Sequence, residues 1–168
     1  MSEYKLVYDL KKHLVRCPEM VADTHAATLD KSKPGGLKGE HGLYGSDEWW
    51  HNIENGLIET EVFEGTIYKV LIDMEYDLLD NYDNAVGVKL DDSYIDIDLG
   101  SDGLSYFGAR FTDGESVESF KHLYRVGNRI KATFILDKLK DPENWLGPRR
   151  KKGVLYLPWQ VFLKESEL

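Results

Sequence analysis

The stretch AVGVKLDDSYIDIDL, residues 85–99, carries an apolar residue at every second position on both sides of a polar turn, Asp91-Asp92-Ser93. Because successive side chains of a strand point to opposite faces, this alternation predicts two strands joined as a hairpin with one apolar face. The apolar positions are Val86, Val88 and Leu90 before the turn and Ile95, Ile97 and Leu99 after it.

The same period of two continues on either side of this hairpin. It predicts further strands over residues 66–74, 106–111, 130–136 and 155–161. Pro158 cannot donate a backbone hydrogen bond, so it indicates a bulge or an edge in the last strand. Between these strands, Val117, Phe120, Leu123 and Tyr124 share a helical face, and Gly127 is a suitable stop.

The first third of the chain has helical and loop patterns. Residues 46–56 predict a short helix with Ser46 as N-cap and Gly56 as its stop. Residues 2–16 fit a helix through apolar positions spaced by three or four, although Leu6, Tyr8 and Leu10 also alternate as in a strand. Residues 23–41 are rich in glycine and polar residues, as in loops. We therefore expect an N-terminal helical appendage (1–22), a linker or wrapped loop (23–41) and a β-barrel domain with a leading short helix (42–168).

Three β segments, a short helix near residues 116–125 and two further strands resemble the OB-fold in their order. The segment Val126–Ala132 is similar to the entry of a barrel strand in that fold, and the resemblance covers residues 60–164. It implies a mainly β (α+β) fold: a five- to six-stranded antiparallel OB-like barrel with short helices. An SH3-like or other small barrel fits nearly as well. The segment Gly42–Gly56 also resembles parts of uncharacterised small bacterial proteins, which implies no activity.

Charge is unevenly distributed along the chain. The 168 residues contain 21 Lys and Arg against 30 Asp and Glu, a net charge of −9. Residues 71–118 hold 13 acids and two bases, whereas residues 119–168 hold five acids and 11 bases. The single cysteine, Cys17, fits a reducing compartment, and no stretch has the apolar length of a membrane helix. We expect a cytoplasmic protein that does not bind membranes.

The acidic middle of the chain is the main candidate site. Alternation places Asp96 and Asp98 on the polar side of their strand, next to the turn that holds Asp91 and Asp92. Four carboxylates on the second and third strands repel phosphate, although OB barrels often bind nucleic acid there. We interpret this acidic face as a binding site for a protein with a basic surface, with a solvated face as the alternative.

Two further candidate sites have structural alternatives. Arg149, Arg150, Lys151 and Lys152 are four adjacent bases that suit phosphate binding, or they form a solvated loop tip. Trp49, Trp50 and Trp145 are candidate interface aromatics, and the alternative places Trp49 and Trp50 in the core and makes Trp145 an anchor of its loop.

Residues suited to catalysis or metal binding do not form a recognisable motif. Asp77, Asp80 and Asp83 are oxygen ligands without the spacing of an EF-hand, so a polar turn is the preferred interpretation. The five histidines have no ligand spacing, and neither a P-loop nor a nucleophile elbow occurs. We predict no cofactor, no dedicated metal site and no catalytic residue.

The main hypothesis is a non-enzymatic protein-binding domain that presents an acidic face to a basic partner. Bacterial immunity proteins, which neutralise cognate toxins, resemble this chain in size, acidity and absence of catalytic motifs. One alternative is an OB-like single-stranded nucleic-acid-binding protein that uses the loop 149–152. A second is a metal-dependent hydrolase.

Overall fold

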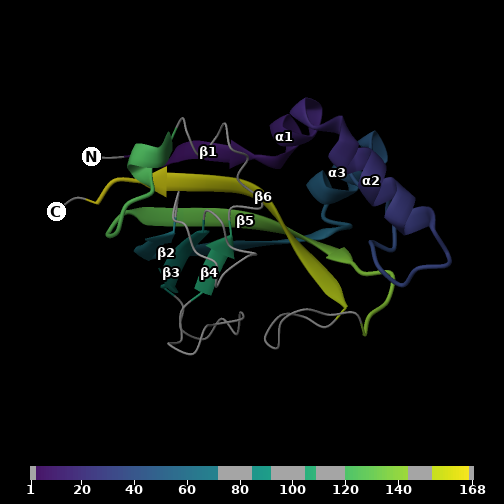
Figure 1. Ribbon diagram of the computed structural model, residues 1–168. Coiled ribbons are helices and arrows are strands. Elements are labelled where there is room, and N and C mark those ends of the chain that lie inside the picture. The colour runs from purple at the N-terminus through teal and green to yellow at the C-terminus, as the bar shows by residue number, and fades with distance from the viewer. Residues whose placement is uncertain (1–2, 72–84, 92–104, 109–119, 144–152, 167–168) are drawn as a thin grey trace.

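The computed structural model describes residues 3–71, 85–91, 105–108, 120–143 and 153–166. Its centre is a six-stranded antiparallel sheet with the order β1-β6-β5-β2-β3-β4 (Figure 1). The strands are β1 (Lys5–Asp9), β2 (Glu59–Leu71), β3 (Ala85–Leu90), β4 (Ser105–Gly108), β5 (Arg129–Lys138) and β6 (Val154–Lys164). The helices are α1 (Leu10–Arg16), α2 (Pro18–Leu29), α3 (Asp47–Glu54) and the 3₁₀ helix η3 (Lys121–Leu123).

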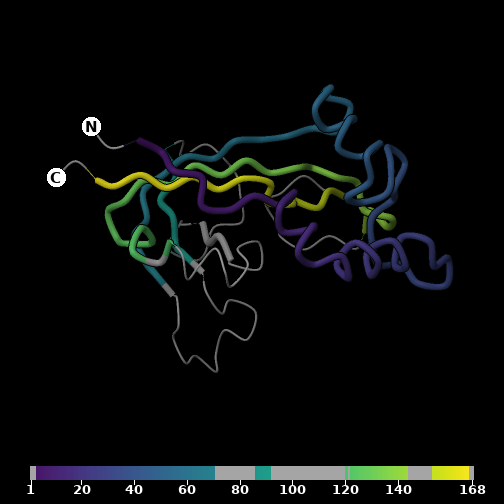
Figure 2. Tube along the Cα trace, turned by 90° about the horizontal axis from the view of Figure 1, so that it is seen from above, coloured from purple at the N-terminus to yellow at the C-terminus, as the bar shows by residue number. Residues whose placement is uncertain are grey.

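The predicted mainly β class with five to six antiparallel strands is confirmed. The sheet is open, however, because β1 and β4 are its two edges and no pairing joins them among the described residues. The predicted barrel is therefore too strong a description, and the OB-fold resemblance is not confirmed. The three numbered α-helices gather at one end of the sheet, as seen from above in Figure 2.

The N-terminal segment differs from the helix predicted over residues 2–16. Residues 5–9 form β1, which pairs with the end of β6, and the helix α1 begins only at Leu10. The backbone N–H of Lys11 donates to the Asp9 carboxylate at 3.0 Å, so Asp9 caps the helix. The helical spacing within residues 2–16 gives no information about a partner strand. Pairing with β6 favours the strand, and Val7 and Tyr8 are buried in it.

The loop predicted over residues 23–41 begins later than expected. The helix α2 continues to Leu29, with Pro18 in its first turn, where the missing N–H costs no helical hydrogen bond. None of its residues is fully buried. A helix without a buried stripe has no strong apolar periodicity, which explains why the sequence pattern did not reveal it.

The helix predicted within residues 46–56 is confirmed. The backbone N–H of Trp49 donates to Ser46 Oγ at 3.2 Å, and Gly56 takes a positive φ of 79° just past the end of α3. The predicted strands over 130–136 and 155–161 are confirmed within β5 and β6. Their pairing shifts register near Pro158, which confirms the predicted bulge.

Other predicted elements are described only in part. The strand predicted over 66–74 belongs to a longer one, β2, that starts at Glu59, and β4 covers part of residues 106–111. The predicted strand with Ile95, Ile97 and Leu99 lies outside the described residues. Of the predicted helix near 116–125, the described part contains η3.

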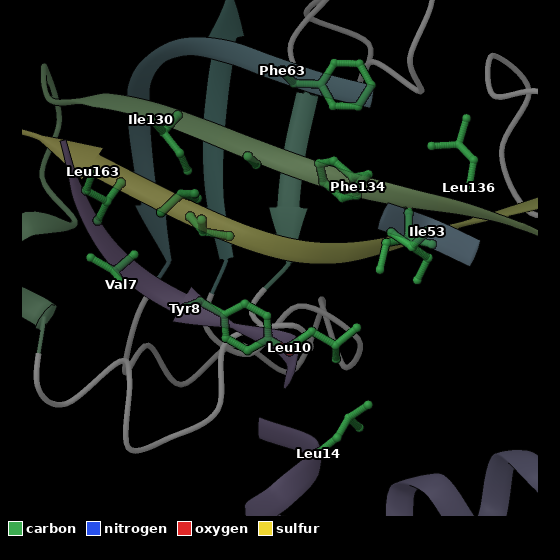
Figure 3. Packing of buried hydrophobic residues seen from close by; sticks show 14 of the residues in the cluster. Val7, Tyr8, Leu10, Leu14, Ile53, Phe63, Ile130, Phe134, Leu136 and Leu163 are labelled. Atoms are coloured by element: carbon green, nitrogen blue, oxygen red, sulfur yellow. The ribbon is translucent and has the colours of Figure 1, made fainter. Parts of the chain in front are cut away.

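Buried hydrophobic side chains from the strands and helices form one cluster (Figure 3). Ala132 of β5 pairs with Phe63 of β2 on one side and with Val161 of β6 on the other, and all three are buried. Paired residues share a face of the sheet, so these side chains mark the core face. Their neighbours on the strands point to the opposite face, where the site described below lies.

Candidate functional site

Asp91 is the only member of the predicted acidic face, Asp91, Asp92, Asp96 and Asp98, that lies within the described residues. It follows β3 directly, and its carboxylate accepts hydrogen bonds from the guanidinium of Arg129, one of them at 2.7 Å from Nη1. These bonds lower the pKa of Asp91. The carboxylate is therefore ionised at neutral pH and exposed, but it is already paired with a cation.

The remaining charged candidates lie outside the described residues. This holds for Asp92, Asp96 and Asp98, for the basic loop Arg149, Arg150, Lys151 and Lys152, for Trp145, and for Asp77, Asp80 and Asp83. Their assignments remain predictions from the sequence. In the part of the chain that the structure covers, no three His, Cys, Asp or Glu side chains gather in a way that suits a metal ion.

Trp49 and Trp50 both lie in the core, which is the alternative that the sequence left open. Their exposed fractions are 0% and 6%. Trp49 Nε1–H donates to the Asp137 carboxylate at 2.9 Å, and Trp50 contacts the ring of Trp159. In this structure both indoles hold α3 against the sheet, so neither is exposed for contact with a partner.

The buried carboxylate of Asp137 accepts a second hydrogen bond, from the backbone N–H of Lys138 at 2.9 Å. Each of its two oxygens therefore accepts one hydrogen bond. Burial nevertheless raises the pKa of Asp137, because removing a carboxylate from water disfavours its charged form. The arrangement satisfies the tryptophan N–H inside the core and has a structural role.

A second polar cluster joins the loop after α2 to the end of β5. The Glu40 carboxylate lies 2.7 Å from Lys138 Nζ, 3.2 Å from Lys38 Nζ and 3.3 Å from His41 Nε2. The hydrogen bond from Lys138, followed by that from Lys38, lowers the pKa of Glu40 to about 2. The cluster is on the surface and fixes a loop, as solvated ion pairs commonly do.

The polar face of the sheet holds a group of charged and aromatic residues that we call the charged sheet face. Cross-strand pairing arranges it in rows, which is possible because paired residues share a face. Lys89, Thr66, Arg129 and Lys164 form one row over β3, β2, β5 and β6. Glu64, Lys131, Phe162 and Leu6 form the next row, over β2, β5, β6 and β1.

A third row follows with Val62, Thr133, Gln160 and Asp9, over β2, β5, β6 and β1. Val62 is 55% exposed, which is high for a branched apolar side chain in a sheet. Farther along β5 the same face carries Ile135 and Asp137, both buried, and there Trp49 of α3 packs on it. The helices therefore cover one end of this face, and the charged rows occupy the end away from them (Figure 1).

Two lysines of the charged sheet face lie over aromatic rings. Lys131 Nζ is 5.0 Å from the centroid of the Tyr4 ring and 5.0 Å from that of Phe162. Lys164 Nζ is also 5.0 Å from the Tyr4 centroid. All three distances fit cation–π contacts. The Tyr4 hydroxyl donates to Glu64 Oε2 of β2 at 3.2 Å, which helps to fix the orientation of the ring.

Sequence reasoning missed this face because its residues are far apart in the chain. A local signal exists in β5, where the polar residues Arg129, Lys131 and Thr133 alternate with buried ones. Only the register of β1, β2 and β6 brings Tyr4, Glu64 and Lys164 beside them. Register is set by the buried face and the bulges, which alternation within one strand does not reveal.

The family model for the immunity protein RhsI2 matches residues 4–149. The chain belongs to the RhsI2 immunity protein family. A search of the curated proteins gave no match. Membership of the RhsI2 family confirms the main hypothesis in its general form: this is a toxin-inhibiting protein with a non-enzymatic role, and its partner is another protein, the toxin.

The matched region of this RhsI2 family member contains β1 to β5 and the rows of the charged sheet face contributed by those strands. It also contains the whole acidic segment 91–98. No helix in the described residues is both long and apolar enough to cross a bilayer.

Proposed function

We propose that this RhsI2 family protein neutralises its toxin by direct binding, with the acidic segment Asp91–Asp98 facing a basic surface of the toxin. The observation that carries the proposal is the concentration of charge: residues 71–118 hold 13 acids and two bases. Such a segment attracts a cationic partner and accelerates the encounter. Asp91, with its lowered pKa, supports the presence of ionised carboxylates at the start of this segment.

The cognate toxin is sought among the products of neighbouring genes and identified by co-purification with this chain. Binding is then measured by titration calorimetry at about 50 mM and about 500 mM NaCl, which differ severalfold in screening length. The key variant combines Asp92→Asn, Asp96→Asn and Asp98→Asn. Asp91 is left intact, because its loss exposes Arg129 without its main partner.

We expect the triple variant to bind the toxin about tenfold more weakly at the lower salt concentration, with a smaller salt dependence than the wild type. The matched control combines Asp23→Asn, Glu48→Gln and Glu54→Gln, which removes the same charge from exposed positions on α2 and α3. Equal weakening by both variants indicates a net-charge effect only and overturns the assignment to the acidic segment. If neither the salt concentration nor the key variant changes the affinity for the toxin, the assignment to the acidic segment is overturned as well.

A further inference from the structure

The charged sheet face is a candidate for a second contact with the same partner. It carries the four bases Lys89, Arg129, Lys131 and Lys164 and the three acids Asp9, Glu64 and Asp91, so it is slightly net positive on a chain whose net charge is −9. Two of these acids are engaged by one base, since Arg129 pairs with Asp91 and lies 3.5 Å from Glu64. Among the described residues, Lys131 and Lys164 pair with no carboxylate.

The two lysines contact the same aromatic ring. Both ammonium groups lie 5.0 Å from the centroid of one ring, that of Tyr4. Ring contacts fix the side chains and reduce the conformational entropy that a partner has to overcome. Neither ammonium group has a carboxylate partner among the described residues, and each therefore attracts a carboxylate of another protein. The chemistry that completes this site is therefore a carboxylate.

The surroundings suit a protein partner. Tyr4 and Phe162 are half-buried aromatic side chains, and the exposed Val62 lies in the adjacent row. Aromatic side chains, tyrosine among them, are enriched among the contact residues that contribute most to protein interfaces. Trp49 of α3 packs on the other end of this face, and Lys131 and Lys164 are both partly exposed.

We propose that the charged sheet face binds an acidic patch of the toxin, with Lys131 and Lys164 contacting toxin carboxylates and Tyr4, Phe162 and Val62 packing beside them. The proposal rests on the proposed function, because it assumes that the toxin is bound directly. It adds a contact of the opposite sign to that of the acidic segment. An interface with both signs selects one partner more strictly than a single charge does, since a wrong partner meets like charges at one of the two places.

The test uses the full chain and the purified toxin obtained by co-purification. The variant Lys131→Gln with Lys164→Gln removes both ammonium groups and keeps long polar side chains. The control, Lys11→Gln with Lys12→Gln on α1, removes the same charge and also one cation–π contact, since Lys11 lies 5.4 Å from the ring of Trp50. The variant Lys131→Arg with Lys164→Arg keeps the charge and tests for rescue.

We expect the Gln pair to weaken toxin binding about tenfold, the control pair to leave it within about twofold, and the Arg pair to restore most of it. Urea unfolding of each variant checks that the fold is retained. A carbodiimide, which joins amines to carboxylates without a spacer, is also applied to the wild-type complex. Peptide mapping is expected to find Lys131 or Lys164 joined to a toxin Asp or Glu.

If the Gln pair binds the toxin with the affinity of the wild type, this inference is overturned, whereas the acidic-segment proposal is unaffected. If the Gln pair unfolds, the cross-linking result decides, and the absence of both lysines from the cross-links overturns the inference. If the acidic-segment variant binds the toxin normally and the Gln pair does not, the toxin-binding site is the charged sheet face and not the acidic segment. A wild-type chain that does not bind the toxin overturns both proposals.

Discussion

His13 is a buried titratable residue near the junction of β1 and α1. Its exposed fraction is 6%, and its Nδ1 lies 2.9 Å from the hydroxyl of Tyr8, which is also buried. Burial, and then the nearby Arg16, lowers the pKa of His13 below 6.5. With Nδ1 accepting from Tyr8, the neutral ring suits this site, and protonation removes the acceptor.

The lowered pKa of His13 predicts that the protein loses stability as pH falls below about 6.5. In that range the unfolded chain binds a proton at this residue that the folded chain resists, so unfolding becomes more favourable. The contribution is fully present above about pH 6.5. Urea unfolding at about pH 7.5 and about pH 5.5 measures the loss, and His13→Gln is expected to show a smaller loss than the wild type. Equal losses in both proteins contradict the prediction.

The pair of Trp49 and Asp137 shows how much of a residue's role a sequence can predict. The helix, its Ser46 cap and the apolar side of Trp49 follow from spacing of three and four residues. The carboxylate that accepts the indole N–H is 88 residues away, in β5. An aspartate in a strand predicts an exposed side chain, so the buried acceptor had no local signal.

Among the elements, β2 is the long central strand that connects the halves of the sheet. It pairs with β5 from Glu59 to Thr66 and with β3 from Gly65 to Leu71. Gly65 belongs to both pairings. A Cβ at this position overlaps the backbone carbonyl oxygen of Lys89 and lies 2.7 Å from a methyl group of Val88. Close approach of two backbones at this point requires a residue without a side chain.

Gly65→Ala is therefore expected to reduce the free energy of unfolding by about 2 kcal/mol or more, because the strands have to separate to admit one methyl group. Gly35→Ala is the control, since no atom lies within 4 Å of its Cβ position. We expect that change to stay within about 0.5 kcal/mol. Urea denaturation followed by tryptophan fluorescence measures both, and similar values for the two variants contradict the argument.

The elements at the start of the chain mark where pattern reasoning fails. A strand of five residues has few positions, and apolar residues in β1 fit a helical spacing as well as an alternating one. Pairing with β6 makes residues 5–9 a strand and not a helix, because Lys5 pairs with Leu163 and Leu6 pairs with Phe162. The strands β3, β5 and β6 were predicted because each has a longer apolar alternation or a buried centre.

For the molecule as a whole, the question is whether residues 1–22 form an appendage. The separation of the chain at residues 23–41 stays a prediction, but Val7 and Tyr8 are each only 2% exposed, and β1 pairs with β6. Burial of each such side chain contributes about 1.5–3 kcal/mol. A domain of this size has about 5–15 kcal/mol of stability in total.

We therefore expect a chain that lacks residues 1–22 to lose cooperative unfolding or to aggregate, since it also exposes the edge of β6. Circular dichroism during heating, together with gel filtration, measures the outcome. Removing residues 167–168 alone is the control and is expected to change nothing. A truncated chain that unfolds cooperatively at the temperature of the full chain supports a separate appendage and contradicts this expectation.

The mainly β fold class and the general binding role of the family could be predicted from the sequence, because alternation indicates the strands, and size and acidity resemble those of immunity proteins. The charged sheet face was not, because Tyr4, Lys131 and Lys164 are brought together by pairing of β1, β5 and β6. The acidic segment, by contrast, is continuous in the sequence, so a count of charged residues along the chain is enough to identify it.

The pairing of Lys5 with Leu163 also constrains how the protein is made. During synthesis, β1 leaves the ribosome well before β6, which is its one partner strand among the described residues. Until then, Val7 and Tyr8 have no sheet to cover them, and the nascent chain carries an unpaired apolar segment that is open to chaperones or to neighbouring chains. Closing so long a stretch of chain is slow, so β1 is expected to join the sheet late in folding, after β6 has been synthesised.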